Sequence, residues 1–500
     1  MSLMLSFTSI KYLIFLLGVL VLYYILPRKI RWIGLLAGNA LFLYKSNSLK
    51  ELLIWLAMAA LTYLAALGIT LLPKEKGKLR MIVMLCGVFL LVTSLVLLQA
   101  STFFGLPDLG LSPLGISYYT LSWIAYLCEA YWGTGEAQKN PLKFLTFAGF
   151  FPLLTSGPIV RYREVGESIT SGNGISYENL TNGAARIAWG FMKKLVIADR
   201  ISVFVNTVYG NPYRYPGAFF IIADAFFVIQ LYADFSGCID IALGSAEMFG
   251  IKLPENFEMP FLSQTLEEFW RKWHITLGGF LRDFVLYPLL KSAPMQAIGR
   301  TGKKLLGKKT GKKLPTWIGL MLSWFLVGFW HGGGWNYIFG VGIFYGFIII
   351  MGDVLSPFLT WLVKLLRINT EAFSWKAFRV VRTWFFFGFG LSFFRAGNLM
   401  DGFRNMKLTF TIFNPWIFFT GELYELGLDR TDFNILAFFL GLLILSGILR
   451  ALSKKSIRAL MAEQNLIFRW ALYALLVYAV IIYGCYGTGF DSASFIYQGF

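Results

Sequence analysis

The chain has 500 residues, of which 57% are hydrophobic and 14% are charged, and its mean hydropathy is +0.63. This composition excludes an ordinary soluble globular protein and indicates a polytopic membrane protein. The net charge of +18 requires no nucleic-acid partner, because the basic residues stand in short stretches between apolar runs, as in cytoplasmic loops that contact anionic membrane lipids.

Long apolar runs recur along the whole chain and predict an all-α fold. At roughly 20 residues per span, they amount to about 11 to 14 transmembrane or re-entrant helices. With no repeat and no long linker, we expect a single integral domain over residues 1–500. Polar residues interrupt the apolar segments of 110–400. Polar residues are costly at membrane depth unless they line a cavity. We therefore expect peripheral helices over 1–105, the catalytic core over 110–400 and further helices over 401–500.

The first apolar run is interpreted as a retained helix. Basic residues follow it at 28–31, and no small-x-small cleavage site is present, so residues 1–27 do not form a typical signal peptide. Basic clusters at 28–31, 74–80, 291–313 and 450–458 are expected in the cytoplasm. The acidic stretch at 421–432 is expected outside, which places the N-terminus outside.

Several polar residues of the central zone are candidates to support a site. They are Arg161, Asp234, Asp240, Glu255 and Asn256. Each also has a structural interpretation as a helix cap, an ion pair or a turn. The four cysteines, Cys86, Cys128, Cys238 and Cys485, are far apart and are interpreted as buried apolar thiols, not as a metal site or disulfide framework.

One of the two histidines, His274, lies in the segment 265–289, where aromatic and leucine side chains recur at helical spacing. His274 falls on this apolar stripe, which predicts that it points inward. Trp273 belongs to the same stripe and is a candidate pocket residue. The opposite face carries several charges, Arg282 and Asp283 among them, so we expect the segment at the interface or in a polar cavity. A structural hydrogen bond and a catalytic role both fit His274.

The stretch 291–313 carries eight basic residues and no acidic one. It is interpreted as a solvated loop that fixes orientation and contacts lipid head groups. A docking surface for a polyanionic donor or an acidic carrier protein is the alternative.

The second histidine, His331, lies in GFWHGGGWNYIF (328–339). An ionisable residue within a membrane segment is a functional-site hypothesis by default. Gly328 and Gly332, and likewise Gly342 and Gly346, are spaced for close helix packing. The alternative for Gly332, Gly333 and Gly334 is that their N–H groups stabilise an oxyanion. Trp330 and Asn336 are further candidates for the pocket.

The chemistry that these residues favour is general-base catalysis. The sequence has no G-x-S-x-G elbow and no H-E-x-x-H motif, and two histidines predict no metal site. A buried imidazole with an intrinsic pKa of about 6.5 can take a proton from a hydroxyl that attacks an acyl group. A thioester donor needs no further activation.

In this order, nine segments resemble the membrane-bound O-acyltransferase family and its alginate O-acetylation branch. They are LGISYYTLSWIAYLCEAY (114–131), FFPLLTSGPIVRYREV (150–165), GFMKKLVIADRI (190–201), DFSGCIDIALG (234–244), PENFEMPF (254–261), EFWRKWHITLGGFLRDF (268–284), GFWHGGGWNYI (328–338), FFRAG (393–397) and FIYQGF (495–500). One departure is SGCID in place of the common SGYSD, which affects the role of Asp240.

The resemblance implies a ring of tilted helices around a central funnel or tunnel in a bacterial inner membrane. It implies that His331 is the family's invariant histidine and that His274 occupies its second polar position. The donor is then acetyl-CoA or an acyl-carrier thioester, with no bound cofactor. The acceptor is an exported polysaccharide or a partner of the SGNH-hydrolase type. D-alanyl transfer to teichoic acid from a carrier protein is the alternative within the family. A transporter or export subunit without covalent chemistry is the rival from another class, disfavoured by the lack of internal symmetry.

Overall fold

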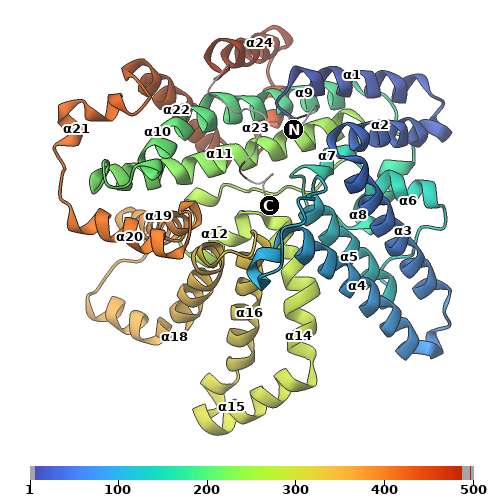
Figure 1. The fold of residues 1–500 in the computed structure, drawn as a ribbon. Coiled ribbons are helices and arrows are strands. Elements are labelled where there is room, and N and C mark those ends of the chain that lie inside the picture. Colours follow the sequence, from blue (N-terminus) through green and yellow to red (C-terminus); the bar gives the residue numbers. More distant parts are fainter. Residues whose placement is uncertain (1–5, 487–495, 497–500) are drawn as a thin grey trace.

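The computed structural model describes residues 6–486 and Ile496, and it confirms the predicted all-helical class. The only β contact among these residues is an isolated antiparallel bridge between Phe257 and Trp273. Helices occupy most of the chain (Figure 1). The longer ones are α1 (Ile10–Ile25), α2 (Arg31–Ser46), α3 (Leu49–Leu71), α4 (Gly77–Gln99), α5 (Ile116–Trp132), α9 (Tyr177–Phe191), α10 (Asp199–Gly210), α11 (Ala218–Met248), α15 (Ala293–Gly311), α16 (Leu314–Trp330), α18 (Phe344–Leu365), α19 (Phe373–Arg395), α20 (Leu399–Thr411), α22 (Arg430–Ser453) and α24 (Leu466–Tyr483).

Within the described part of the chain, six helical stretches are long and apolar enough to cross a membrane. They are Leu49–Leu71, Lys74–Gln99, Ala218–Met248, Trp335–Leu365, Arg430–Ser453 and Leu466–Tyr483, and α1 and α16 are shorter apolar helices. This number is lower than the predicted 11 to 14 because the prediction also counted short and re-entrant pieces. The chain is a multi-pass membrane protein.

The centre of the molecule is formed by α11 and the helices antiparallel to it (Figure 1). Helix α9 continues through the π-helical turn η4 (Met192–Ala198) into α10, and this long rod lies along α11. Two pairs of glycines permit the close approach. A Cβ on Gly183 would lie 2.6 Å from the Gly244 oxygen, and one on Gly190 would lie 2.6 Å from the Gly237 oxygen. Small residues at matching heights let two helix backbones come this close.

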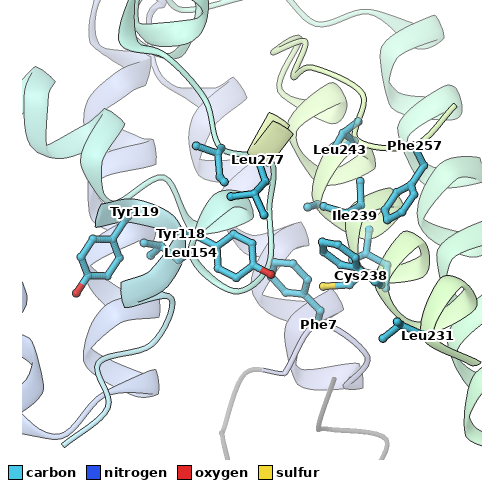
Figure 2. Packing of buried hydrophobic residues seen from close by; sticks show 14 of the residues in the cluster. Phe7, Tyr118, Tyr119, Leu154, Leu231, Cys238, Ile239, Leu243, Phe257 and Leu277 are labelled. Carbon is cyan, nitrogen blue, oxygen red and sulfur yellow. The ribbon is translucent and has the colours of Figure 1, made fainter. Parts of the chain in front are cut away.

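The N-terminal helices cover one side of this centre. The Tyr12 hydroxyl of α1 lies 2.8 Å from the Ser245 hydroxyl of α11. Buried apolar side chains from both regions, including Phe7, Cys238 and Leu243, form one continuous cluster (Figure 2). Helix α4 faces outward, with only 6% of its apolar window buried. Cys86 lies on it and is exposed, so the prediction of a buried thiol was wrong there, whereas the other three cysteines are buried.

Two of the basic clusters expected in the cytoplasm lie at the same end of α11. The Arg31 guanidinium donates to the Asn173 oxygen at 2.5 Å, and the Asn173 amide donates to the Phe249 oxygen at 3.2 Å. At this end, Arg458 forms an ion pair with Glu247. Helix α22 runs from the acidic stretch 421–432 to the basic cluster 450–458 over 24 residues, about 36 Å at 1.5 Å per residue. The acidic and basic segments therefore lie at opposite ends of α22.

Two predicted segments have a different form in the structure. The stripe at 265–289 is not one helix: α12 (Leu266–Lys272) ends at Trp273, and α13 (Ile275–Phe280) starts after His274. The basic stretch 291–313 is not an extended loop but largely the helix α15, which is interrupted at Gly307 and projects from the centre with α14 (Tyr287–Lys291) and α16 as an arm (Figure 1).

Candidate active site

His274 stands at the break between α12 and α13, in a left-handed conformation with φ of 46°. A side chain other than glycine adopts this conformation at a cost, so its surroundings must hold it. Asn256 does so: its Oδ1 lies 3.2 Å from His274 Nδ1 and accepts hydrogen bonds from the N–H and the hydroxyl of Thr276. Because this amide oxygen is an acceptor, Nδ1 of His274 carries the proton. Nε2 is then its basic nitrogen.

His331 caps the C-terminus of α16, with its N–H donating to the Gly328 oxygen at 3.3 Å. Its side chain is 4% exposed, the same fraction as that of His274. The predicted inward orientation of His274 is therefore confirmed, and both imidazoles are enclosed by protein. Burial favours the neutral imidazole, which is the form that accepts a proton.

Trp330 contacts both histidines. Its ring centroid is 5.8 Å from that of His274 and 4.9 Å from that of His331. The indole N–H donates to the Ser117 oxygen at 3.2 Å, which fixes the ring against α5. Phe235 on one side of His274 and Phe394 on one side of His331 enclose the pair further. The sequence predicted both histidines as candidate site residues, and in the structure both contact one indole ring.

The backbone N–H groups of the first two glycines after His331 cap the end of α16 and are not available to a ligand. The N–H groups of Gly332 and Gly333 both donate to the Phe329 oxygen, at 3.2 and 3.0 Å. The suggestion that they expose their amides beside the imidazole is therefore wrong in this structure. Only Gly334 of the three remains a candidate oxyanion donor. The packing interpretation is confirmed for Gly328, whose Cβ would lie 2.6 Å from the Ile338 Cα.

We expect Gly328→Ala to destabilise the protein by about 1–3 kcal/mol, because the added methyl overpacks two helix backbones that touch. Gly352→Ala is the matched control: it lies within α18, and a Cβ there meets nothing within 4 Å. That change should stabilise the helix slightly. The midpoints of thermal unfolding in detergent measure both effects. Equal midpoints for the two variants would contradict the close approach.

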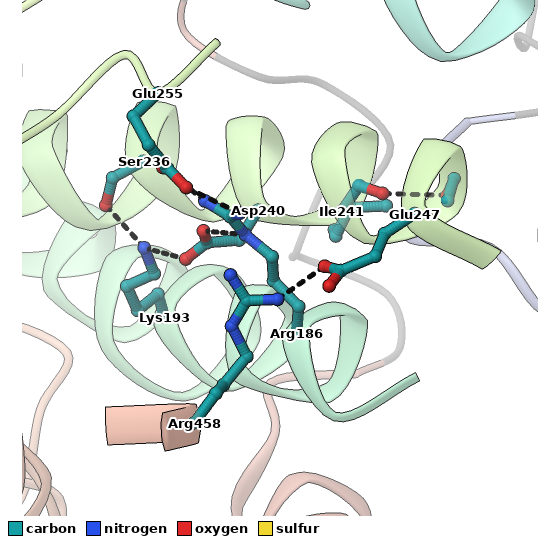
Figure 3. A network of polar contacts seen from close by, with 9 residues as sticks. Arg186, Lys193, Ser236, Asp240, Ile241, Glu247, Glu255 and Arg458 are labelled. Atoms are coloured by element: carbon teal, nitrogen blue, oxygen red, sulfur yellow. Dashed lines mark hydrogen bonds and ion pairs between the residues drawn. The ribbon is translucent and has the colours of Figure 1, made fainter. Parts of the chain in front are cut away.

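Asp240 and Glu255 belong to an ionic network that joins α9, η4, α11 and the loop after α11 (Figure 3); Asp240 is largely buried in it, and Glu255 is half exposed. Arg186 joins them, with Nε 2.8 Å from Asp240 and its two terminal nitrogens on the Glu255 carboxylate. Lys193 lies 2.6 Å from the other Asp240 oxygen and 2.8 Å from the Ser236 hydroxyl. Since Glu255 precedes Asn256, this network anchors the loop that holds His274.

Asp234 belongs to a second network, six residues before Asp240 on α11. Lys194 lies 2.7 Å from Asp234 and 2.8 Å from Asp199. The remaining Asp234 oxygen accepts a hydrogen bond from the Ile496 N–H at 2.8 Å. The family-like segment FIYQGF (495–500) lies outside the described residues except for Ile496.

Arg161, Arg282 and Asp283 form a third group, at the start of the arm. Arg161 forms an ion pair with Asp283, and Arg282 lies 2.7 Å from the same carboxylate. Burial opposes the ionisation of Asp283, but the hydrogen bonds from the two guanidinium groups outweigh it and lower the pKa of this carboxyl. This group holds η6 (Leu281–Leu286) to the segment before α8 (Tyr162–Thr170).

The predicted residues thus have different roles in the structure. Of the supporting polar candidates, Asn256 is the one that contacts an imidazole among the described residues. Trp273 packs against Phe257, Phe269 and Phe387 in the aromatic core beside His274. Asn336 donates to the Ala396 oxygen at 3.0 Å and ties the turn after His331 to the end of α19.

Sequence reasoning missed the basic partners of these networks, Arg186, Lys193 and Lys194. A signal was present: two adjacent lysines within GFMKKLVIADRI would be costly at membrane depth unless paired. The aromatic residues Tyr118, Phe235 and Phe394 around the histidines carried no comparable signal, because apolar side chains are common throughout this chain.

The sequence of this central region matches a family model. Residues 116–299 fit the model of the membrane-bound O-acyltransferase family. This range contains His274, Asn256 and all three ionic networks, and it ends before His331.

Curated relatives agree with this match. The probable alginate O-acetylase of Pseudomonas syringae pv. tomato is 32% identical over 308 residues, which cover 61% of this chain and 53% of the relative. The peptidoglycan O-acetyltransferase of Helicobacter pylori is 30% identical, and the match covers 53% of this chain and 54% of the relative. The teichoic acid D-alanyltransferase of Streptococcus thermophilus is 31% identical, and the match covers 57% of this chain and 65% of the relative. The matched part of the chain therefore spans about half the length of the alginate O-acetylases, and residues 116–299 are similar to the membrane-bound O-acyltransferase family.

Proposed function

We propose that this protein transfers an acyl group, acetyl in the first instance, from a cytoplasmic thioester to a hydroxyl on the outer side of a bacterial inner membrane. The acceptor is a hydroxyl of an exported polysaccharide or of an SGNH-type partner that passes the group on. The observation that carries this proposal is the placement of two buried imidazoles on one indole, in a chain whose central region is similar to this family.

In the proposed reaction, His331 is the general base. Its imidazole accepts the proton of the acceptor hydroxyl while that oxygen attacks the thioester carbonyl carbon. The C–S bond then breaks, and the thiolate leaves and takes the proton from the imidazolium. His274, with Nε2 as its basic nitrogen, orients the acceptor or polarises the carbonyl, and Gly334 is the remaining candidate oxyanion donor.

The donor assay tests this proposal. Purified protein incubated with [14C]acetyl-CoA and an oligosaccharide acceptor should release free thiol and yield labelled ester. Movement of the acceptor across a vesicle membrane without consumption of the donor would instead favour a transporter and contradict the proposal.

Asn256 acts as a positioning residue in this scheme. We expect Asn256→Ala to slow acyl transfer by about 10- to 100-fold, because His274 loses the acceptor that fixes its ring and its left-handed backbone. Asn256→Asp retains an oxygen acceptor and should recover part of the rate. Both rates are measured with the labelled donor on protein that elutes as a single folded species. Equal rates for the alanine variant and the unmodified protein would contradict the positioning role.

A D-alanyl transferase is the second candidate, favoured by the teichoic acid D-alanyltransferase relatives. Such an enzyme takes its donor from an acidic carrier protein, and the basic helix α15 offers a surface of the opposite charge. A pull-down with an acidic acyl-carrier protein at low and moderate salt tests this candidate. Failure to form a complex at either salt concentration would leave acetyl-CoA as the donor.

A further inference from the structure

The arm ends in a short hairpin, residues 303–310, which we call the arm tip; Figure 1 shows α15 at the far end of the arm. Two glycine backbones close the hairpin at its base. A Cβ on Gly302 would lie 2.9 Å from the Gly311 oxygen, and one on Gly311 would lie 2.1 Å from the Gly302 oxygen. Between them, Gly307 adopts a φ of 78°, which costs a glycine little and lets the chain turn back. As a result, every residue of the arm tip is exposed.

An apolar pair lies at the centre of the arm tip, between two pairs of lysines. Leu305 and Leu306 are 77% and 52% exposed, and lysines occupy positions 303–304 and 308–309. Exposure of leucine to water is unfavourable, and adjacent exposed apolar side chains rimmed by charge mark sites that contact a membrane or a partner. Lysines beside leucines are typical of segments that lie on an anionic membrane surface.

The lysines of the arm tip are not neutralised within the described part of the chain. The basic stretch 291–313 contains no acidic residue. Its one ion pair among the described residues joins Lys313 to Asp353 at the base of the arm. Asp353 also accepts a hydrogen bond from the Trp317 indole at 2.9 Å, which holds the base to α18. The positive charge of the arm tip is therefore available to an external anion.

The arm tip leads directly into an apolar helix. Helix α16 begins at Leu314, three residues after Gly311, and is one of the shorter apolar helices. Ile318 and Leu322, about one helical turn apart on α16, are 38% and 40% exposed, as expected for side chains that face lipid. The basic stretch is expected on the cytoplasmic side, so the nearest anionic surface is the head-group layer of the inner leaflet.

We propose that the arm tip binds the inner leaflet through anionic phospholipid, with Leu305 and Leu306 at the edge of the acyl chains and the lysines on lipid phosphates. Burial of the leucines removes apolar surface from water. Each lysine adds an attraction that is felt within about 8–10 Å at physiological ionic strength. Continuity with the lipid-facing side of α16 favours a membrane over a soluble acidic protein as the partner. Attachment of the arm in this way does not depend on acyl transfer.

A fluorescent label on the arm tip of the full chain in nanodiscs tests the proposal. NBD is attached to the Leu305→Cys variant in a Cys86→Ser background, since the other three native cysteines are buried. Lipids that carry a spin label near the top of the acyl chain should quench NBD at least about twofold more in nanodiscs containing phosphatidylglycerol than in pure phosphatidylcholine. High salt should reduce this difference, because it screens the lysines.

Two sets of lysine substitutions distinguish the arm tip from the general charge of the chain. The arm-tip variant combines Lys303→Gln, Lys304→Gln, Lys308→Gln and Lys309→Gln. The control variant removes charge from another basic cluster expected in the cytoplasm and combines Lys74→Gln, Lys76→Gln and Lys78→Gln. The arm-tip variant should lose the effect of phosphatidylglycerol on quenching, whereas the control variant should retain it.

Equal quenching in the two lipid compositions, or unchanged quenching in the arm-tip variant, would overturn the proposal. Loss of the phosphatidylglycerol effect in the control variant as well would assign it to general charge and would also overturn it. An acidic acyl-carrier protein provides a further comparison. If the carrier shifts NBD emission in phosphatidylcholine nanodiscs while phosphatidylglycerol does not increase quenching, the arm tip is a docking surface for a carrier protein and the lipid assignment is wrong.

Discussion

Replacing His331 with alanine should lower the rate of acyl transfer by about 10²- to 10⁴-fold, the usual loss when a general base is removed. The substitution leaves no group at this position that can accept the hydroxyl proton. Because the imidazole is 4% exposed and held between Trp330 and Phe394, water is poorly placed to take over. The measurement is the turnover of labelled acetyl donor into ester at saturating donor and acceptor.

The loss of acyl-transfer rate must be distinguished from a loss of folded protein. The His331 side chain fills space in the core, so the variant is compared by thermal unfolding, and His331→Gln, which preserves more of the volume, serves as a second variant without a base. His274→Ala is the internal comparison, since we expect a smaller loss for an orienting group. Near-normal turnover by folded His331→Ala protein would rule out this mechanism.

The sequence predicted well those features that depend on local pattern or on the cost of burial. The helical class follows from the length of the apolar runs. The inward position of His274 follows from its place on an apolar stripe, and the close packing at Gly328 follows from glycine spacing. Each of these is decided by residues within a few turns of one another.

Other features depend on contacts between distant segments and could not be read from the chain. The apolar spacing continues through His274, so nothing local shows that the helix breaks there. The break is stabilised by Asn256, 18 residues earlier. Likewise, Asp240 pairs with Arg186, which is 54 residues away in the chain. The pattern of charged residues along a sequence does not specify which of them form ion pairs. The glycines after His331 were misjudged because a helix cap consumes the same N–H groups that an oxyanion site would require.

Lys194→Met should destabilise the protein by about 3–5 kcal/mol, the cost of leaving buried charge without a partner. The Lys194 side chain is 4% exposed, and its ammonium group lies 2.7 Å from Asp234 and 2.8 Å from Asp199. Methionine has a similar length and apolar stem, so the change removes the charge with little loss of volume. We expect a clearly lower midpoint of thermal unfolding in detergent and less folded protein from the membrane.

The control for Lys194 is an ion pair that differs mainly in exposure. Arg271 lies 2.8 Å from Glu267 within α12, and the two side chains are 65% and 66% exposed. Arg271→Gln should therefore change stability by no more than about 1 kcal/mol. Adding Asp234→Asn to Lys194→Met should restore part of the loss, because it removes one of the two unpaired carboxylates. If Lys194→Met is as stable as Arg271→Gln, the carboxylates beside Lys194 are not ionised in the folded protein, and the network along α11 is held by neutral hydrogen bonds instead of charge.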